Sequence, residues 1–347
     1  MSQDLYRARG IRSNPAGRLA TTWSEPDESG PAPETELAGQ PCRSLITHNQ
    51  SPDVPFTRSI NPYRGCEHGC VYCFARPTHS YLELSPGADF ESRIFFKQGA
   101  EDVLERELSR ENYVCEPIAL GTATDPYQPA EREQQLTRRL LQVLARFGHP
   151  VSIITKSSLI LRDLDILGPM ARQGLASVAV SVTTLDNRIK AQLEPRASAG
   201  GRRLETIRRL AAESVPVTVL AAPVIPFIND HELEAILEQS AEAGARDAGY
   251  VVLRLPHEVG PLWREWLAEH YPDRAERVMQ VVQSLHGGRD YRSRFHERQR
   301  GQGQWAELIA RRFEVAARKA ELDSERGSEL RTDLFAVPGS GVQLPLV

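Results

Sequence analysis

The sequence alternates short apolar, β-branched runs with amphipathic segments, and this alternation restricts the folds open to the chain. The runs lie at residues 57–63, 116–121, 151–156, 177–183, 216–224 and 250–255. Strands that alternate with helices form parallel sheets through right-handed crossovers. The sequence therefore predicts an α/β protein with either an open doubly wound sheet or a partial (β/α)6 barrel of the TIM type.

Helical periodicity supports the same arrangement. Helices are expected near residues 98–110, 130–147, 162–174, 201–214, 230–243 and 261–284. The second of these has an apolar face formed by Leu136, Leu140, Val143, Leu144 and Phe147. In both candidate folds the functional residues gather at the carboxyl ends of the strands, so the loops there are where we look for chemistry.

The two ends of the chain differ from this central region. Residues 1–55 are rich in Pro, Gly, Ser, Thr and charge without periodicity, which predicts a mostly disordered leader. Residues 56–285 form the predicted barrel, and residues 286–347 form a basic extension with interleaved aromatics. Such an extension forms either a nucleic-acid groove or a helix that closes the barrel with Ile309, Phe313 and Ala316.

Composition excludes several classes of protein. The chain has 347 residues and a formal net charge of −4, which argues against a protein that coats nucleic acid by bulk charge. It shows neither an apolar run long enough to span a bilayer nor the apolar core of a signal peptide, so we expect a cytoplasmic protein. Its five cysteines are too few for a disulfide framework.

Three of these cysteines lie within eight residues. Cys66, Cys70 and Cys73 have the spacing C-x₃-C-x₂-C, and Gly65 and Gly69 allow the loop to bring the sulfurs together. Three thiolates suit a 4Fe-4S cluster that keeps one iron open. Structural zinc, the alternative, prefers four ligands, and the histidines near enough to complete such a set are His68 and His79.

The cysteine loop directly follows the first predicted strand and carries an aromatic residue, Tyr72, before its third cysteine. In this, the chain resembles the radical S-adenosylmethionine (SAM) superfamily. Further motifs are similar to the branch related to the spore photoproduct lyases, whose bacterial members include proteins without an assigned reaction. These motifs are YRGCEHGCVYCFAR, TDPYQPAE, TKS, SVTTLD, LEPR, PVIPFIND and LRLPHE, and the resemblance covers about residues 55–315.

The resemblance implies a partial (β/α)6 barrel and a specific chemistry. Cys66, Cys70 and Cys73 would bind a 4Fe-4S cluster, and the amino and carboxylate groups of SAM would bind the fourth iron. An electron from a flavodoxin or ferredoxin would then cleave SAM to a 5′-deoxyadenosyl radical that abstracts a hydrogen atom. Tyr72 takes the position whose backbone meets the adenine.

Polar residues at the predicted strand ends are the candidates for binding SAM. They are Gly121, Thr122, Thr124, Asp125, Lys156, Ser157, Ser181 and Thr183. Asp125 would accept from the SAM ammonium, although a Pro-rich turn capped by this aspartate also explains the segment. We assign the SAM carboxylate to Arg196, for which the alternative is an ion pair with Glu194.

Four residues are candidates for catalysis or substrate binding. Tyr127 would lie over the pocket or relay a hydrogen atom, or it simply packs. Asn229 opens a helix with Asp230, where N-capping is the alternative role. His257 and Glu258 follow the sixth strand and would face substrate or serve structure.

Three functions remain open at this stage. The first is lyase-type or repair-type radical chemistry on nucleic acid, and the second is radical modification of a small molecule, peptide or protein. The third is a non-catalytic zinc or iron–sulfur binding module. Photoproduct lyases quench their product radical with a cysteine where this chain has Thr122, and we expect Cys115 to lie toward the other end of the barrel.

Overall fold

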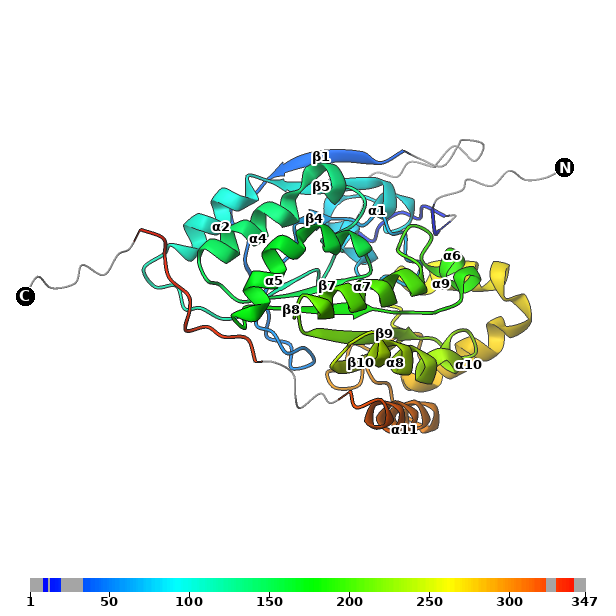
Figure 1. Cartoon of the computed structure of the whole chain (residues 1–347). Helices are drawn as coiled ribbons and strands as arrows, with labels where there is room; N and C mark the ends of the chain where they lie inside the picture. Colours follow the sequence, from blue (N-terminus) through cyan, green and yellow to red (C-terminus); the bar gives the residue numbers. More distant parts are fainter. Residues whose placement is uncertain (1–8, 12, 20–33, 323–328, 340–347) are drawn as a thin grey trace, which may run out of the picture.

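The computed structural model describes residues 9–11, 13–19, 34–322 and 329–339. Its main sheet has the spatial order β10-β9-β8-β7-β6-β3-β2 (Figure 1). The strands are β2 (Thr47–His48), β3 (Arg58–Ile60), β6 (Ile118–Leu120), β7 (Val151–Thr155), β8 (Ala176–Ser181), β9 (Val217–Val224) and β10 (Asp247–Val252). All neighbours from β3 to β10 pair in parallel, and only β2 is antiparallel. The six parallel strands follow the predicted runs, and the partial (β/α)6 barrel is confirmed.

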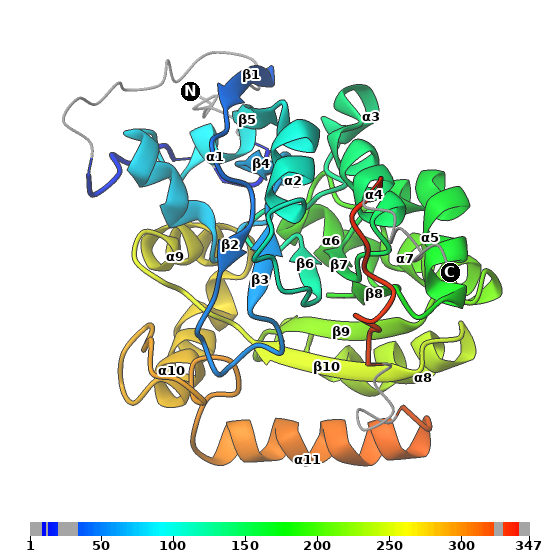
Figure 2. The same cartoon turned by 90° about the vertical axis from the view of Figure 1, so that its left-hand side faces the viewer.

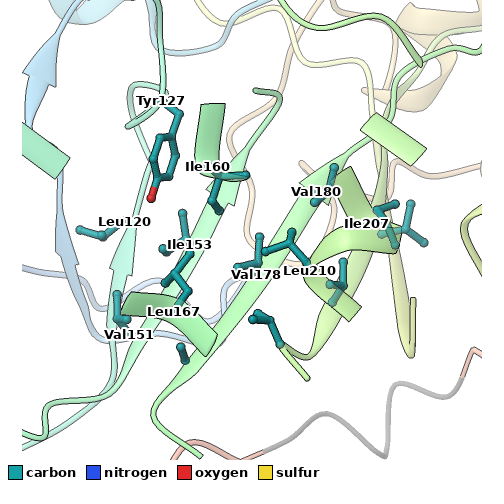
Figure 3. Close-up of a cluster of buried hydrophobic side chains, with 14 of the residues drawn as sticks. Leu120, Tyr127, Val151, Ile153, Ile160, Leu167, Val178, Val180, Ile207 and Leu210 are labelled. Atoms are coloured by element: carbon teal, nitrogen blue, oxygen red, sulfur yellow. The ribbon is translucent and has the colours of Figure 1, made fainter. Parts of the chain in front are cut away.

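Helices cover the outer face of this sheet (Figure 1). They are α2 (Ala100–Leu108), α4 (Leu136–Arg146), α5 (Leu164–Arg172), α7 (Gly200–Ala212) and α8 (Leu233–Glu242). The strands alternate accordingly: in β8, Ala176, Val178 and Val180 are buried while Ser177 and Ala179 are only partly buried. Figure 3 shows buried strand residues beside Ile160, Leu167, Ile207 and Leu210 from the helical layer.

Two predicted helices are broken. The helix expected at 130–147 consists of α3 (Glu131–Gln134) and α4, because Gln135 between them has a left-handed φ of 47°. The long helix expected at 261–284 consists of α9 (Val259–His270) and α10 (Ala275–Leu285). Pro272, which has no N–H to donate, lies between them. An additional helix, α6 (Asn187–Leu193), is capped by the carboxylate of Asp186.

Part of the predicted leader is folded. β1 (Glu36–Pro41) pairs with β5 (Arg93–Gln98), and β5 pairs with β4 (Tyr63–Arg64) in a second sheet. Leu45 is fully buried, and the carboxylate of Glu107 accepts from its backbone N–H at 3.1 Å. Contacts between residues distant in sequence leave no periodic pattern in the sequence itself, which is why the folding of this Pro-rich and Gly-rich segment was not predicted. Residues 1–8, 12 and 20–33, also part of the predicted leader, lie outside the described residues.

The C-terminal extension packs on the barrel. α11 (Gln304–Lys319) lies along α8 and β10 (Figure 2), with Ile309 and Ala316 buried and the rings of Phe313 and Tyr250 4.7 Å apart. The helix thus packs against the barrel through the residues that the sequence analysis named. Residues 329–339 cross the amino ends of the strands, where the Ala336 N–H donates to the Phe147 carbonyl at 3.0 Å. Among the described residues, no helix is both long and apolar enough to cross a membrane.

Candidate functional site

The cysteine loop follows β3 and β4 and leads into the short helices η1 (Arg76–Leu82) and α1 (Ala88–Ser92). Two of its glycines have left-handed backbones, with φ of +81° at Gly65 and +67° at Gly69. A Cβ atom at Gly65 would lie 2.8 Å from the Ile94 side chain, so this position has space only for glycine. The glycines thus fix the backbone path of the cysteine loop at the mouth of the barrel, by which we mean the end formed by the carboxyl ends of the parallel strands.

Backbone groups of the loop favour the thiolate form of its cysteines. The backbone of His68 lowers the pKa of the Cys66 thiol, and the backbones of Ala75 and Arg76 lower that of Cys73. Backbone N–H groups near a sulfur tune sulfur-bound metal clusters. The loop therefore fits a thiolate-bound group, although burial raises the pKa of Cys66, Cys70 and Cys73 and keeps the metal-free thiols protonated. Metal binding would release these protons.

The side chain of Arg76 stabilises the cysteine loop through hydrogen bonds to its backbone. Its side chain is fully buried, and Nε and Nη2 donate to the Cys70 carbonyl at 3.0 and 2.8 Å. Nη1 donates to the carbonyls of Pro86 and Gly87, and the guanidinium pairs with buried Glu91. One arginine thus joins the cysteine loop to the segment before α1. Sequence reasoning missed Arg76, whose only signal is its position three residues after Cys73.

The histidines of the zinc alternative have other partners. Nδ1 of His68 lies 3.4 Å from Asp125, and Nε2 of His79 lies 3.0 Å from the Arg93 carbonyl oxygen. Within the described parts of the chain, no group of three or more His, Cys, Asp and Glu side chains is arranged to hold a metal ion, and this applies to the three loop cysteines as well as to the histidines.

Asp125 is buried, and its carboxylate is already well supplied with donors. It accepts from the Thr155 hydroxyl at 2.8 Å, from the Lys156 N–H at 2.8 Å and from the Tyr127 N–H at 2.9 Å. Burial raises the pKa of Asp125, but the charge of His68 and the hydrogen bonds lower it by more. The pKa of Asp125 therefore lies below its ordinary value. In this structure Asp125 ties three loops of the mouth together.

Glu194 is the centre of a second buried network. It is fully buried and pairs with Arg203, with Lys156 at 3.3 Å and with the hydroxyl of Tyr72. Thr183 donates to it at 2.7 Å. Burial raises the pKa of Glu194, but Arg203 and Lys156 outweigh this effect and hold the pKa well below its usual range. The network brings Tyr72, Lys156 and Thr183 together, and Glu194 and Arg203, which the sequence analysis did not place among the SAM-binding residues, join them.

Arg196 does not pair with Glu194, so the ion pair considered from the sequence is wrong. Its Nη1 lies 2.8 Å from Glu67, which also accepts from Thr35 at 2.6 Å. The pairing differs because Arg203, one turn into α7, reaches Glu194 from the helix side. Arg196 is 36% exposed, and Nη1 is its one hydrogen-bonded side-chain nitrogen among the described residues.

The remaining SAM candidates have structural partners. Thr124 donates to the Gly65 carbonyl at 2.7 Å, and Ser181 donates to the Ala222 carbonyl at 3.1 Å. Ser157 caps η2 (Ser158–Asp163). The Thr122 hydroxyl accepts a hydrogen bond from the Asn61 side chain at 3.0 Å. A Cβ atom added at Gly121 would lie 2.4 Å from the Ile154 carbonyl oxygen, so the chain approaches β7 closely there.

The catalytic candidates do not gather at one point. Tyr127 is fully buried among the outer-layer residues of Figure 3 and donates to Asp163 at 3.1 Å, which shows that it packs. Asn229 is buried and donates to the Thr183 and Pro223 carbonyls, and its side chain caps no helix. His257 is exposed, and Glu258 pairs with Arg18 at 3.6 Å.

The face of the sheet opposite the helices carries side chains of mixed size. Ser152, Ser177, Ala179, Thr218 and Ala222 are small and partly buried, and Ile154 and Leu220 on the same face are large. Cys115 precedes β6, at its amino end and away from the cysteine loop, as expected.

Comparison with known proteins identifies the family. The sequence model described as "Radical SAM superfamily" matches residues 60–239. The chain belongs to the radical SAM superfamily. An uncharacterised protein of Mycobacterium tuberculosis is 37% identical over 245 residues, which are 69% of this chain and 72% of that relative. An uncharacterised protein of Methanocaldococcus jannaschii is 25% identical over 173 residues, covering 50% of this chain and 62% of the relative.

Solved structures show that this radical SAM protein shares its fold with spore photoproduct lyase. A variant of that enzyme matches with a TM-score of 0.54 and 15% identity, over 82% of this chain and 79% of the other. Spore photoproduct lyase complexed with dinucleoside spore photoproduct matches with a TM-score of 0.50 and 16% identity, over 68% and 66%. Members of the radical SAM superfamily generally use a 4Fe-4S cluster and SAM.

Proposed function

We propose that this enzyme binds a 4Fe-4S cluster through Cys66, Cys70 and Cys73 and cleaves SAM reductively. The observation that carries this proposal is the three-cysteine loop of a chain from the radical SAM superfamily, with the buried Arg76 side chain donating to the Cys70 carbonyl. When bound, the cluster and SAM supply a 5′-deoxyadenosyl radical for hydrogen abstraction, with a flavodoxin or ferredoxin as reductant. A cytoplasmic location is part of the proposal, because the thiols must stay reduced.

The chain's own residues bind and orient the cofactor. The backbone of Tyr72 meets the adenine, while its hydroxyl is held by Glu194 and Thr183. Lys156, Ser181 and Thr183 line the inner side of the mouth. Arg196 binds the SAM carboxylate with the guanidinium donors that Glu67 leaves open. Asp125 fixes the loops after β6 and β7.

Cluster loading under anaerobic conditions tests the metal site. Wild-type protein and the Cys115→Ala variant should take up iron and sulfide and develop the visible absorption of thiolate-bound iron. The Cys70→Ala variant should lose most of both, because one iron then lacks its thiolate. Equal iron content in the Cys70→Ala and Cys115→Ala variants would contradict the proposal.

For the substrate, we propose nucleic acid. The support is the fold shared with a photoproduct lyase and the arginine-rich segment 286–303. Binding of single-stranded and duplex DNA should weaken steeply with salt, because each neutralised phosphate releases counterions. A flat salt dependence would favour the second candidate, radical modification of a small molecule, peptide or protein.

A further inference from the structure

Arg254 lies at the rim of the mouth, between the cysteine loop and the C-terminal extension. It follows the carboxyl end of β10 by two residues. Its guanidinium carbon lies 4.7 Å from the ring centroid of Phe74, the residue after Cys73, and 6.0 Å from that of Tyr291. Two aromatic rings from distant parts of the chain therefore hold one cation beside the cysteine loop.

This cation lacks a counter-charge, unlike the other basic groups around the mouth. Lys156 pairs with Glu194, Arg196 with Glu67 and Arg18 with Glu258. Among the described residues, no carboxylate lies within 4.0 Å of Arg254. Its one side-chain hydrogen bond there is a long contact of 3.4 Å from Nη2 to the Tyr291 hydroxyl.

One donor of Arg254 is also buried without a partner. Nε is shielded from solvent, and no acceptor in the described structure reaches it. A buried, charged donor with no acceptor is costly, and such groups in native proteins require an explanation. An acceptor from a bound ligand provides one.

The chemistry of the group limits what this ligand is. Stacking against Phe74 and Tyr291 restrains the guanidinium and leaves its edge donors for a two-point contact. The Phe74 ring is 46% exposed, so the platform is open to solvent. A fork of two N–H donors matches two oxygens of a phosphate or a carboxylate. Nearby His286 is buried, and burial lowers its pKa, so it brings no competing charge.

We propose that Arg254 binds an oxyanion of the substrate, a phosphate or a carboxylate, at the rim of the cysteine loop. The role as a substrate-binding residue rests on the proposed function, because the substrate must lie near the SAM that the loop would hold. Arg254 thereby selects for anionic substrates and sets their orientation relative to the cysteine loop.

Calorimetric titration with inorganic phosphate and with succinate tests the site. Wild type should bind one of the two saturably, both as the loaded protein with SAM and as the metal-free chain, and the anion that binds identifies the chemistry. Arg254→Gln should weaken this binding roughly tenfold or more, and Arg254→Lys should fall between, because a lysine provides charge without the fork. Arg146→Gln, which removes an exposed arginine on α4, is the matched control and should bind like wild type.

Three results would overturn the proposal. They are the absence of saturable binding of either anion by wild type, equal binding by wild type and Arg254→Gln, and a parallel loss of SAM binding in Arg254→Gln. The third would assign Arg254 to the cofactor. Iron content and thermal unfolding of each variant establish that it is folded. Titrations of the metal-free chain separate this proposal from the proposed function, because failure of cluster loading leaves the Arg254-dependent anion binding intact.

Discussion

At the scale of single residues, buried charges rather than apolar contacts organise the mouth of this barrel. Glu194 has no exposure to solvent, yet it forms ion pairs with Arg203 and Lys156 and accepts a hydrogen bond from the Tyr72 hydroxyl. Charges removed from water are tolerated only when they are paired and hydrogen-bonded. Glu194 therefore acts as a positioning residue for Tyr72 and Lys156, both of which are predicted to contact SAM.

The Glu194→Gln variant should be strongly destabilised, because it leaves Arg203 buried without its anion. We expect the free energy of unfolding in urea to fall by about 3–5 kcal/mol. Glu205→Gln removes the partner of Arg208 in an exposed pair, and should change it by less than about 1 kcal/mol. Similar losses in the two variants would show that the buried network does not carry the stability assigned to it.

At the scale of elements, the cysteine loop depends on backbone conformations that only glycine adopts readily. Gly69 has a φ of +67°, and a Cβ atom there would lie 3.1 Å from the Glu91 carboxylate and 3.2 Å from the Pro195 ring. The same carboxylate pairs with Arg76 under the loop. Strain at Gly69 would therefore be transmitted to the support of Cys70.

Gly69→Ala should reduce iron uptake more than it reduces stability. We expect a cost of about 1–2 kcal/mol in the free energy of unfolding, from the left-handed backbone and the close contacts. Iron content after anaerobic loading should fall several-fold. Gly201→Ala in the first turn of α7 meets no atom within 4 Å and should leave both quantities near wild type. Full iron uptake by the Gly69→Ala variant would refute the strained-loop argument.

At the scale of the whole molecule, buried histidines make stability depend on pH. Burial lowers the pKa of His79 and of His149 to about 4, below the value of about 6.5 in an unfolded chain. The unfolded state therefore binds more protons between these values, and stability falls as the pH drops from about 6.5 to about 4. Asp125 and Glu194, whose pKa values are lowered, add a further loss as the pH falls below about 4.

Burial also lowers the pKa of His286, so the free energy of unfolding should decline below pH ~6.5 with a slope of up to about three protons. His149→Gln should reduce that slope by up to about one proton. Denaturant unfolding at several pH values measures these slopes. A stability that is level from pH ~6.5 to ~5 would contradict the assignment of three buried neutral histidines.

The sequence predicts the barrel better than it predicts the contacts within the mouth. The six strands were found because helices bury one face of each, which requires regular apolar residues such as Val178 and Val180. β1 and β5 were missed because they pair with each other across a large distance in sequence, with Leu37 opposite Ile94, and such a contact leaves no local pattern. The cysteine spacing indicated a metal site, whereas the partner of Arg196 depends on the three-dimensional position of Arg203 and was not predictable from the motif.

Formation of 5′-deoxyadenosine from SAM tests the central claim most directly. Anaerobically loaded wild-type protein, given SAM and a strong reductant, should produce 5′-deoxyadenosine and methionine in equal amounts, measured by liquid chromatography and mass spectrometry. Cys115→Ala should do the same, and Cys70→Ala should produce neither. A fully loaded wild-type protein that leaves SAM intact, or Cys70→Ala protein that cleaves it at the wild-type rate, would contradict the account.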